Sequence, residues 1–300
     1  MVPRGSHRSV SARLGFGLLI AVVLGLGGIV LSRNLLARAR AQPAYQFDPM
    51  RVALGDSVPA WLDPAMARAF LSTYQHVASK PFSLLDQASL TAWAKRVKAL
   101  AWVQDCAMRL RLPDAAHLSL TLRRPVAYAQ GALQRTWLFD RDGSRFPLHG
   151  QGNHATSVLA STERLPELRG LGAAEAPHLE AYCGAAQVAA CFMEEVLPSV
   201  AKAAGPGVPL PRLLGIDLAN AGLRRSRDRP EFRVVVAGPT KRPVFLEWGH
   251  APGSSHRLVP ASTKAEVLAL ILRERPGLAG LAAADLRFRH RWRVRLVAAQ

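Results

Sequence analysis

The sequence predicts an α+β protein with one N-terminal apolar helix, a small unit that mixes helices and strands, and a larger β-rich region. Three observations support this fold class. An uncharged apolar run occupies residues 14–32. Apolar residues then recur with helical spacing between about 64 and 100, and alternate with polar ones from 106 to 122. Several short strand-like segments recur after residue 129, with two helical patterns between them.

The apolar run carries no charged side chain between Arg13 and Arg33. As a helix rising about 1.5 Å per residue, it approaches the roughly 30 Å thickness of a bilayer core. We therefore predict a transmembrane helix at 14–32, with residues 1–13 in the cytoplasm and 33–46 as a basic linker outside it. Arginines flank the run equally, so the orientation rests on the short leading segment and the long domain that follows.

A cleaved signal peptide is the alternative to an anchor. Two small-x-small triplets, Ala37-Arg38-Ala39 and Ala39-Arg40-Ala41, resemble cleavage sites. However, the apolar run is longer than the roughly 7–15 residues of a signal-peptide core. The length favours a retained anchor, and the alternative stays open.

The composition is that of a folded, strongly basic chain. Net charge is +18 over 300 residues, which favours anionic lipid, acidic protein or nucleic acid as partners. No zinc-finger, RNA-binding or helix-turn-helix signature is present, so we expect no nucleic-acid partner. Cys183 and Cys191 lie eight residues apart on a predicted helix, about 12 Å along its axis, so we expect no disulfide between them.

The unit at 47–128 is predicted to run strand, helix, helix, strand, strand. A short strand is expected at 47–54 and a first helix after Asp63-Pro64. Asp86 or Ser89 is predicted to cap the second helix. Alternating residues at 106–112 and 118–122 then predict a β-hairpin with one buried face.

The region at 129–300 contains a hairpin signal, two helical patterns and several short strands. Asp142-Gly143 predicts a hairpin turn between 137–139 and 144–146. The helices are expected at 177–197 and from Ser262 or Thr263 to Pro276. The internal strands are expected at 216–218, 232–237 and 244–248.

The last predicted strand, residues 285–297, has the most regular pattern in the chain. Its apolar residues share one face, and its arginines at 287, 289, 291, 293 and 295 share the other. If it lies at a sheet edge, its free backbone groups can pair with another chain, and the arginines favour an acidic one. The alternative is an interior strand with solvated arginines. The candidate partner-binding residues are Asp285, Arg287, Phe288, Arg291, Trp292, Arg293 and Val294.

The usual signatures of catalysis and cofactor binding are absent. The sequence has no P-loop, no GxSxG elbow and no HExxH motif. His149 and His154 lack a third ligand for a metal. Glu194 and Glu195 are adjacent and diverge by about 100° on a helix. We therefore expect no enzyme activity, no cofactor, no metal and no small-molecule ligand.

Several short motifs, taken in order, resemble the bacterial cell-division family FtsQ, also called DivIB. They are Trp102-Val103, Arg109 with Leu112-Pro113-Asp114, Leu118, Arg123-Arg124-Pro125-Val126-Ala127, Leu138-Phe139-Asp140 with Gly143 and Phe146, Leu165-Pro166-Glu167-Leu168-Arg169-Gly170, Trp248-Gly249, and Asp285-Leu286-Arg287-Phe288. The resemblance extends over most of the chain. It departs from the family at Leu122, where an acid is common, and in the long alanine- and proline-rich region 171–211.

This resemblance implies a POTRA domain at 47–128 and an FtsQ-type β domain at 129–300, both outside the inner membrane. It also implies a non-enzymatic scaffold that binds partners of the FtsB and FtsL type through its last strand. Two other classes remain as alternatives. One is a POTRA-bearing transport or secretion component, which normally shows repeats or a membrane barrel. The other is a membrane-anchored hydrolase, with a triad assembled in space.

Overall fold

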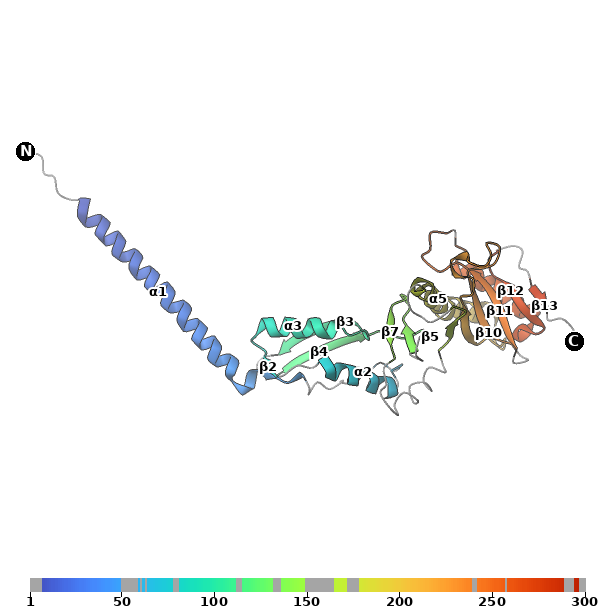
Figure 1. Cartoon of the computed structure of the whole chain (residues 1–300), viewed down its shortest axis with the longest axis horizontal. Coiled ribbons are helices and arrows are strands. Elements are labelled where there is room, and N and C mark those ends of the chain that lie inside the picture. The colour runs from blue at the N-terminus through green and yellow to red at the C-terminus, as the bar shows by residue number, and fades with distance from the viewer. Residues whose placement is uncertain are drawn as a thin grey trace, which may run out of the picture. The chain divides into compact units, whose positions relative to one another are not determined.

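The structure is a computed structural model (Figure 1). It describes residues 7–49, 59, 61–62, 64–77, 81–111, 115–131, 136–148, 165–171, 178–238, 242–256, 258–288 and 294–296, with no side chains described at 7–22, 65, 66, 69, 76, 111 and 115–118. The chain forms two compact units. The first comprises Met1–Leu54, Gln75–Ala99 and Asp105–Thr121, and the second comprises Gly55–Tyr74, Leu100–Gln104 and Leu122–Gln300.

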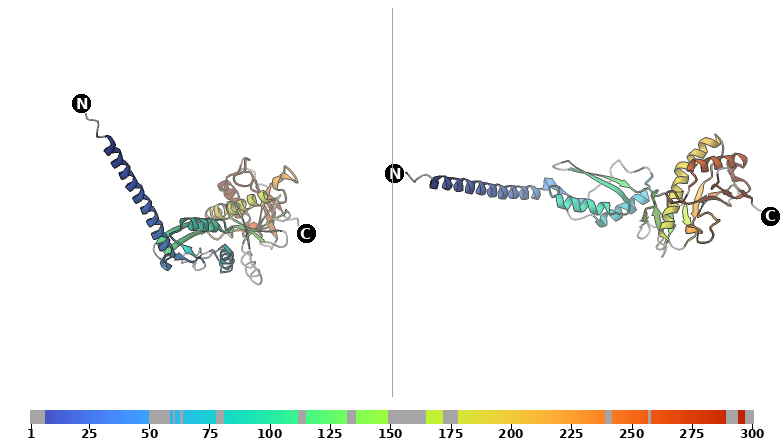
Figure 2. Two further views of the ribbon diagram at one scale, coloured as in Figure 1. Left: turned by 60° about the vertical axis from the view of Figure 1, so that its left-hand side comes forward. Right: turned by 90° about the horizontal axis from the view of Figure 1, so that it is seen from above.

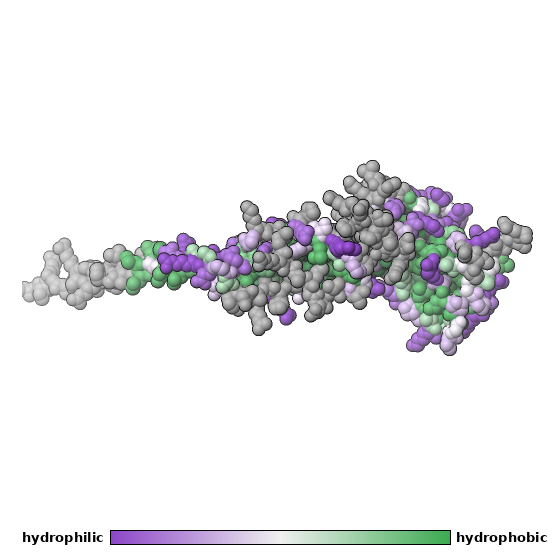
Figure 3. All heavy atoms as spheres, turned by 90° about the horizontal axis from the view of Figure 1, so that it is seen from below, coloured by the Kyte–Doolittle hydropathy of each residue, from purple (hydrophilic) through white to green (hydrophobic). Residues whose placement is uncertain are grey.

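A single helix, α1 (His7–Ala41), contains the whole apolar run. The helical prediction is confirmed, and its described apolar side chains, such as Leu24 and Leu31, are exposed. Figure 3 shows hydrophobic residues at the surface of the described part of this helix. In the described part of the chain, no helix is long and apolar enough to cross a membrane. Within the predicted linker 33–46, residues 33–41 are helical and continue α1. Leucine, alanine and arginine favour helix there, and the chain leaves the helix just before Pro43.

The first unit contains two short antiparallel ladders and helix α3 (Gln87–Lys98). One ladder pairs β1 (Gln46–Phe47) with β2 (Phe82–Ser83). Asp86 caps α3 by accepting from the backbone N–H of Ala88, and the Ser89 hydroxyl donates to the same carboxylate at 2.6 Å. Trp93 of α3 is fully buried, with its ring centroid 5.1 Å from that of Phe47.

The expected hairpin is present. Strands β3 (Val103–Arg111) and β4 (Ala115–Leu122) pair, which confirms the predicted hairpin, although Leu110 of its expected buried face is 40 % exposed. Helix α2 (Pro64–Val77) confirms the first predicted helix, although its expected cap Asp63 lies outside the described residues. The predicted strand 47–54 is seen only as β1, and residues 50–58 also lie outside the description.

The second unit is built on a mixed nine-stranded sheet (Figures 1 and 2). Its order is β13-β12-β11-β10-β9-β8-β5-β6-β7. The pairs β5–β8, β8–β9 and β11–β12 are parallel, and the others are antiparallel. The strands are β5 (Ala127–Gln130), β6 (Thr136–Phe139), β7 (Arg145–Pro147), β8 (Glu167–Arg169), β9 (Leu213–Asp217), β10 (Phe232–Ala237), β11 (Pro243–Gly249), β12 (Leu281–Asp285) and β13 (Val294–Leu296).

Helices supply the crossovers that the parallel pairs require. The connection from β8 to β9 contains α5 (Leu179–Cys191), a π-helical turn (Phe192–Val196) and α6 (Leu197–Ala204). The predicted helix 177–197 is therefore extended by one α-helical segment. Helix α7 (Ala261–Glu274) connects β11 to β12. It begins at Ala261, before the predicted caps Ser262 and Thr263. Its N-cap residue is Pro260, which has an extended backbone and makes no side-chain cap bond.

The main hydrophobic core is formed by residues of these helices and of the sheet. Figure 2 shows the ribbons of the helices and of the sheet from two further directions. Along β11, Val244, Leu246 and Trp248 enter this core. Their neighbours Phe245 and Glu247 belong to the opposite face, as strand alternation requires. Near the C-terminal ends of β11 and β12, the sheet carries charged side chains.

The structure corrects the prediction of one strand at 285–297. Strand β12 ends at Asp285, residues 286–288 are not strand, and β13 returns antiparallel to β12. The Asp285 carboxylate accepts a hydrogen bond from the backbone N–H of Arg287 at 2.9 Å, so the side chain forms an Asx turn that ends the strand. The alternation of apolar and charged residues continues through this turn in the sequence, so the alternation alone does not show where β12 ends.

Candidate functional site

Strand β13 (Val294–Leu296) forms one edge of the nine-stranded sheet. It pairs with β12 on one side, and no described strand pairs with its other side. Arg295 and Leu296 are exposed, and 54 % of the Leu296 surface is accessible. Within the described ranges, an edge strand with an exposed leucine and arginine is thus available to another chain.

The opposite edge, β7, is less suited to strand addition. Pro147 ends β7 and has no backbone N–H to donate. Its carbonyl accepts a hydrogen bond from Trp102 Nε1 at 3.1 Å, and the Trp102 ring packs edge-on against Phe146 with centroids 5.0 Å apart. Of the two edges, β13 is therefore the better candidate for a docking surface.

Arg287, a predicted partner-binding residue, is held within its own chain. Its Nε and Nη2 donate to the Asp285 carboxylate, at 3.0 Å to Oδ1 and 2.7 Å to Oδ2. Nη2 also donates to Glu247 Oε2 at 3.2 Å, and Nη1 donates to the Asp228 carbonyl at 3.1 Å. Arg287 therefore joins the ends of β11 and β12 to the loop at 228.

The pKa values of the two carboxylates in this network are shifted in opposite directions. Burial opposes the ionisation of Asp285, but the hydrogen bonds and positive charge of Arg287 hold its pKa below the ordinary value. Burial, and then the negative charge of Asp285, raise the pKa of Glu247. Glu247 and Asp285 are direct neighbours in the parallel register, so each charge affects the other. Arg287 lowers the pKa of both carboxylates and so favours their ionised forms.

The structure places the predicted site residues in different surroundings. Asp285 and Arg287 pair with each other, and Arg287 also pairs with Glu247. Phe288 is 48 % exposed just beyond β12, and Val294 opens β13. Residues 291–293, with Arg291, Trp292 and Arg293, lie outside the described residues, and that part of the prediction is not tested.

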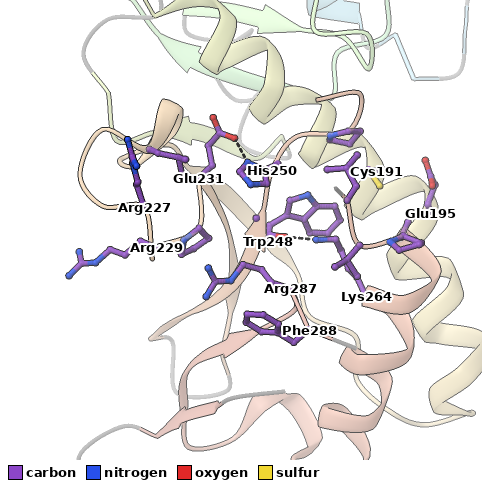
Figure 4. Close-up of a pocket in the computed structure, with 18 residues that line it drawn as sticks. Cys191, Glu195, Arg227, Arg229, Glu231, Trp248, His250, Lys264, Arg287 and Phe288 are labelled. Carbon is purple, nitrogen blue, oxygen red and sulfur yellow. Dashed lines mark hydrogen bonds and ion pairs between the residues drawn. The ribbon is translucent and has the colours of Figure 1, made fainter. Parts of the chain in front are cut away.

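Sequence reasoning missed a pocket beside this network (Figure 4). It lies in the second unit and has a volume of about 400 Å³. Trp248, Lys264 and Phe288 contribute to its wall. Lys264 is only 4 % exposed, which is unusual for a lysine. The sequence pattern predicted a helix at this position and gave no sign that the lysine is buried.

An arginine-rich loop beside the pocket is organised by Asn220, which is buried. Its amide nitrogen donates to the carbonyls of Ser226, Arg229 and Pro230, at 2.9–3.1 Å. Its carbonyl oxygen accepts from the backbone N–H groups of Arg225 and Ser226. Both the nitrogen and the oxygen of the Asn220 side chain thus form hydrogen bonds that shape the loop carrying Arg227 and Arg229.

The described histidines, cysteines and carboxylates do not form a metal-binding group. No group of three or more His, Cys, Asp or Glu in the described ranges is arranged to hold a metal, and His149 and His154 lie outside them. Cys106, Cys183 and Cys191 are free thiols. Burial, and then the nearby Glu195 carboxylate, raise the pKa of Cys191 to about 11, so this thiol stays protonated at neutral pH.

Comparisons with known proteins assign nothing further. No family model matches the chain, and no curated protein matches it.

Proposed function

We propose that this protein is a non-enzymatic, single-pass membrane scaffold of the bacterial division machinery, which binds its partners by strand addition at β13. The proposal combines the resemblance of the sequence motifs to the FtsQ family with the position of β13 at the sheet edge. The edge is the observation that carries it, because an unpaired strand supplies a row of backbone donors and acceptors. The expected partners are division proteins of the FtsB and FtsL type.

The contact residues are revised by the network around Arg287. Val294, Arg295 and Leu296 provide the backbone ladder, and Phe288 provides apolar surface nearby. Arg295 takes the role assigned in the sequence to Arg287, since it is exposed on the edge strand. Arg291, Trp292 and Arg293 remain partner-binding residues on the basis of the sequence alone.

Ladder bonds and apolar burial dominate the energetics of this docking. An exposed ion pair between Arg295 and a partner's acid contributes about 0–1 kcal/mol. Burying the exposed half of a leucine or phenylalanine contributes on the order of 1 kcal/mol each. Charge therefore selects an acidic partner, and the backbone and apolar contacts hold it.

Site-specific photo-crosslinking in cells tests the docking edge. A photoreactive residue at Leu296 is compared with one at Leu270, an exposed leucine of α7 with 46 % accessibility. We expect position 296 to capture a division protein of the FtsB or FtsL type and position 270 to capture none. Equal capture at both positions, or capture of none at 296, would contradict docking at β13.

The membrane anchor is part of the same proposal. The uncharged stretch 14–32 lies within the continuous helix α1, and the side chains described there are apolar and exposed rather than packed in a core. Residues 1–13 are placed in the cytoplasm and the two folded units outside it. Carbonate extraction of membranes should leave the chain in the pellet, and replacing Leu24 and Ile29 with arginine should release it.

A further inference from the structure

The pocket beside Arg287 is lined by the start of α7, the end of β11, the π-helical turn and the arginine-rich loop (Figure 4). Its volume of about 400 Å³ falls in the range of small-molecule sites. The indole of Trp248 and the side chains of Leu258, Pro260 and Phe288 supply apolar surface. Lys264 projects from the first turn of α7 into this wall, beneath the indole.

Lys264 is a buried cation without a counter-anion. Its ammonium donates to the backbone carbonyl of Trp248 and lies 4.1 Å from the centroid of the Trp248 ring. Among the ion pairs formed by the described residues, none includes Lys264. One carbonyl and one ring face account for part of its bonding capacity, since an ammonium has three donors.

The other charged groups around the pocket do not neutralise Lys264. They lie in the π-helical turn, in the arginine-rich loop, and just after β11 and at the end of β12: Glu195, Arg227, Arg229, Glu231, His250, Asp285 and Arg287, while the neighbouring Cys191 thiol is protonated at neutral pH. Glu231 pairs with His250 at 2.9 Å, and Arg287 pairs with Asp285 and Glu247. His256 stacks on His250 with ring centroids 4.1 Å apart. Glu195 lies beside the Cys191 thiol and forms no ion pair with Lys264 among those that the described residues make.

We propose that this pocket binds a small apolar carboxylate, whose carboxylate pairs with the Lys264 ammonium and whose body packs against Trp248 and Phe288. A carboxylate carries the single negative charge that one buried cation requires. A dianionic phosphate would leave a second charge to be desolvated in an apolar site. The site is separate from the β13 ladder, so its test does not depend on partner capture.

The titration of Lys264 gives the proposal a specific signature. Burial lowers the pKa of Lys264 to about 8. A carboxylate binds the protonated form, so its affinity should fall about tenfold between pH 7 and pH 9. At pH 8 binding should draw about half a proton from solution, because the ligand raises the pKa of the lysine it pairs with.

Calorimetry on the full chain in an uncharged detergent measures both effects with phenylacetate as the probe. Two buffers of different ionisation enthalpy report the proton uptake. Phenylacetamide, the neutral analogue, and inorganic phosphate serve as comparison ligands. We expect phenylacetate to bind at least tenfold more tightly than either one.

Matched lysine variants complete the test. Lys264→Met should weaken phenylacetate binding at least tenfold and remove its pH dependence. Lys202→Met, on the exposed surface of α6, should change neither. Because Lys264→Met also alters a buried site, the side-chain titration of Lys264 in the unmodified protein is followed by NMR and should move upward when phenylacetate is added. Equal binding of the amide, tighter binding of phosphate, or an unchanged titration would overturn the proposal.

Discussion

Arg287→Met is the substitution that most directly tests the network at the end of β12. It removes the guanidinium that donates to Asp285, Glu247 and the Asp228 carbonyl. Methionine keeps much of the apolar stem, so the change is mainly electrostatic. Two neighbouring carboxylates then remain without their shared cation.

The expected cost follows from the burial of the three side chains. Removing one partner of a fully buried ion pair costs about 3–5 kcal/mol. Here the side chains are 26 %, 20 % and 6 % exposed for Arg287, Glu247 and Asp285. Water partly screens the network, so we expect a loss of about 2 kcal/mol in local stability at pH 7.

The loss should depend on pH with a definite sign. In the wild-type protein the lowered pKa of Asp285 contributes stability above its unfolded pKa, and this contribution is lost as pH falls. In the variant both carboxylates are buried beside each other without the arginine, so their pKa values rise. Their ionisation then destabilises the fold as pH increases. The gap between the two proteins should therefore be larger at pH 7 than at pH 4.

Hydrogen exchange on the full chain in detergent measures this gap. Peptides covering β11 and β12 report the local opening free energy. Arg212→Met, at an exposed arginine before β9, is the control. A difference below about 0.5 kcal/mol between the Arg287 and Arg212 variants would refute the reasoning, as would a gap that does not change with pH.

The remaining predictions concern the loop and a turn. Asn220→Ala should remove five hydrogen bonds and loosen residues 220–231 by about 2 kcal/mol, seen as faster amide exchange there and unchanged exchange in β5–β6. Gly143→Ala should destabilise the second unit by at least 2 kcal/mol in thermal unfolding. Gly143 has φ +82, and an added Cβ would lie 2.9 Å from Cys183 Cβ. Gly207→Ala, with φ +87 and nothing within 4 Å, should cost about 1 kcal/mol for the backbone alone.

Sequence patterns predicted those elements whose cause is local. The β6–β7 hairpin is one, because Asp140 accepts from the backbone N–H groups of Asp142 and Ser144 and so fixes the turn before Gly143. The cap of α3 by Asp86 is another. In both cases the side chain that decides the structure lies within four residues of the backbone it bonds.

Elements that depend on distant neighbours were not predicted. Strand β12 is mostly alanine and has no alternation, and it becomes a strand because β11 and β13 pair with it on both sides. The three-residue β8 is similarly defined by β5 and β9. The pocket combines α7, β11 and the loop at 227–231, and nothing in the sequence near Lys264 indicates that this lysine is buried.

The role of Arg287 also determines how mutations of the docking edge must be interpreted. Because Arg287 fixes the end of β12, its loss should disturb the strand on which β13 pairs and reduce partner capture without any direct contact. Arg295→Glu tests contact more cleanly, since Arg295 is exposed and no described ion pair depends on it. Arg212→Glu matches its change in net charge at an exposed position away from the edge. We expect Arg295→Glu to weaken capture of an acidic partner while amide exchange in β11 and β12 changes much less than in Arg287→Met, because Arg295 acts on Glu247 only through its charge and forms no described ion pair with it. Equal weakening by both substitutions would assign the effect to overall charge, and docking at β13 would then lose its electrostatic support.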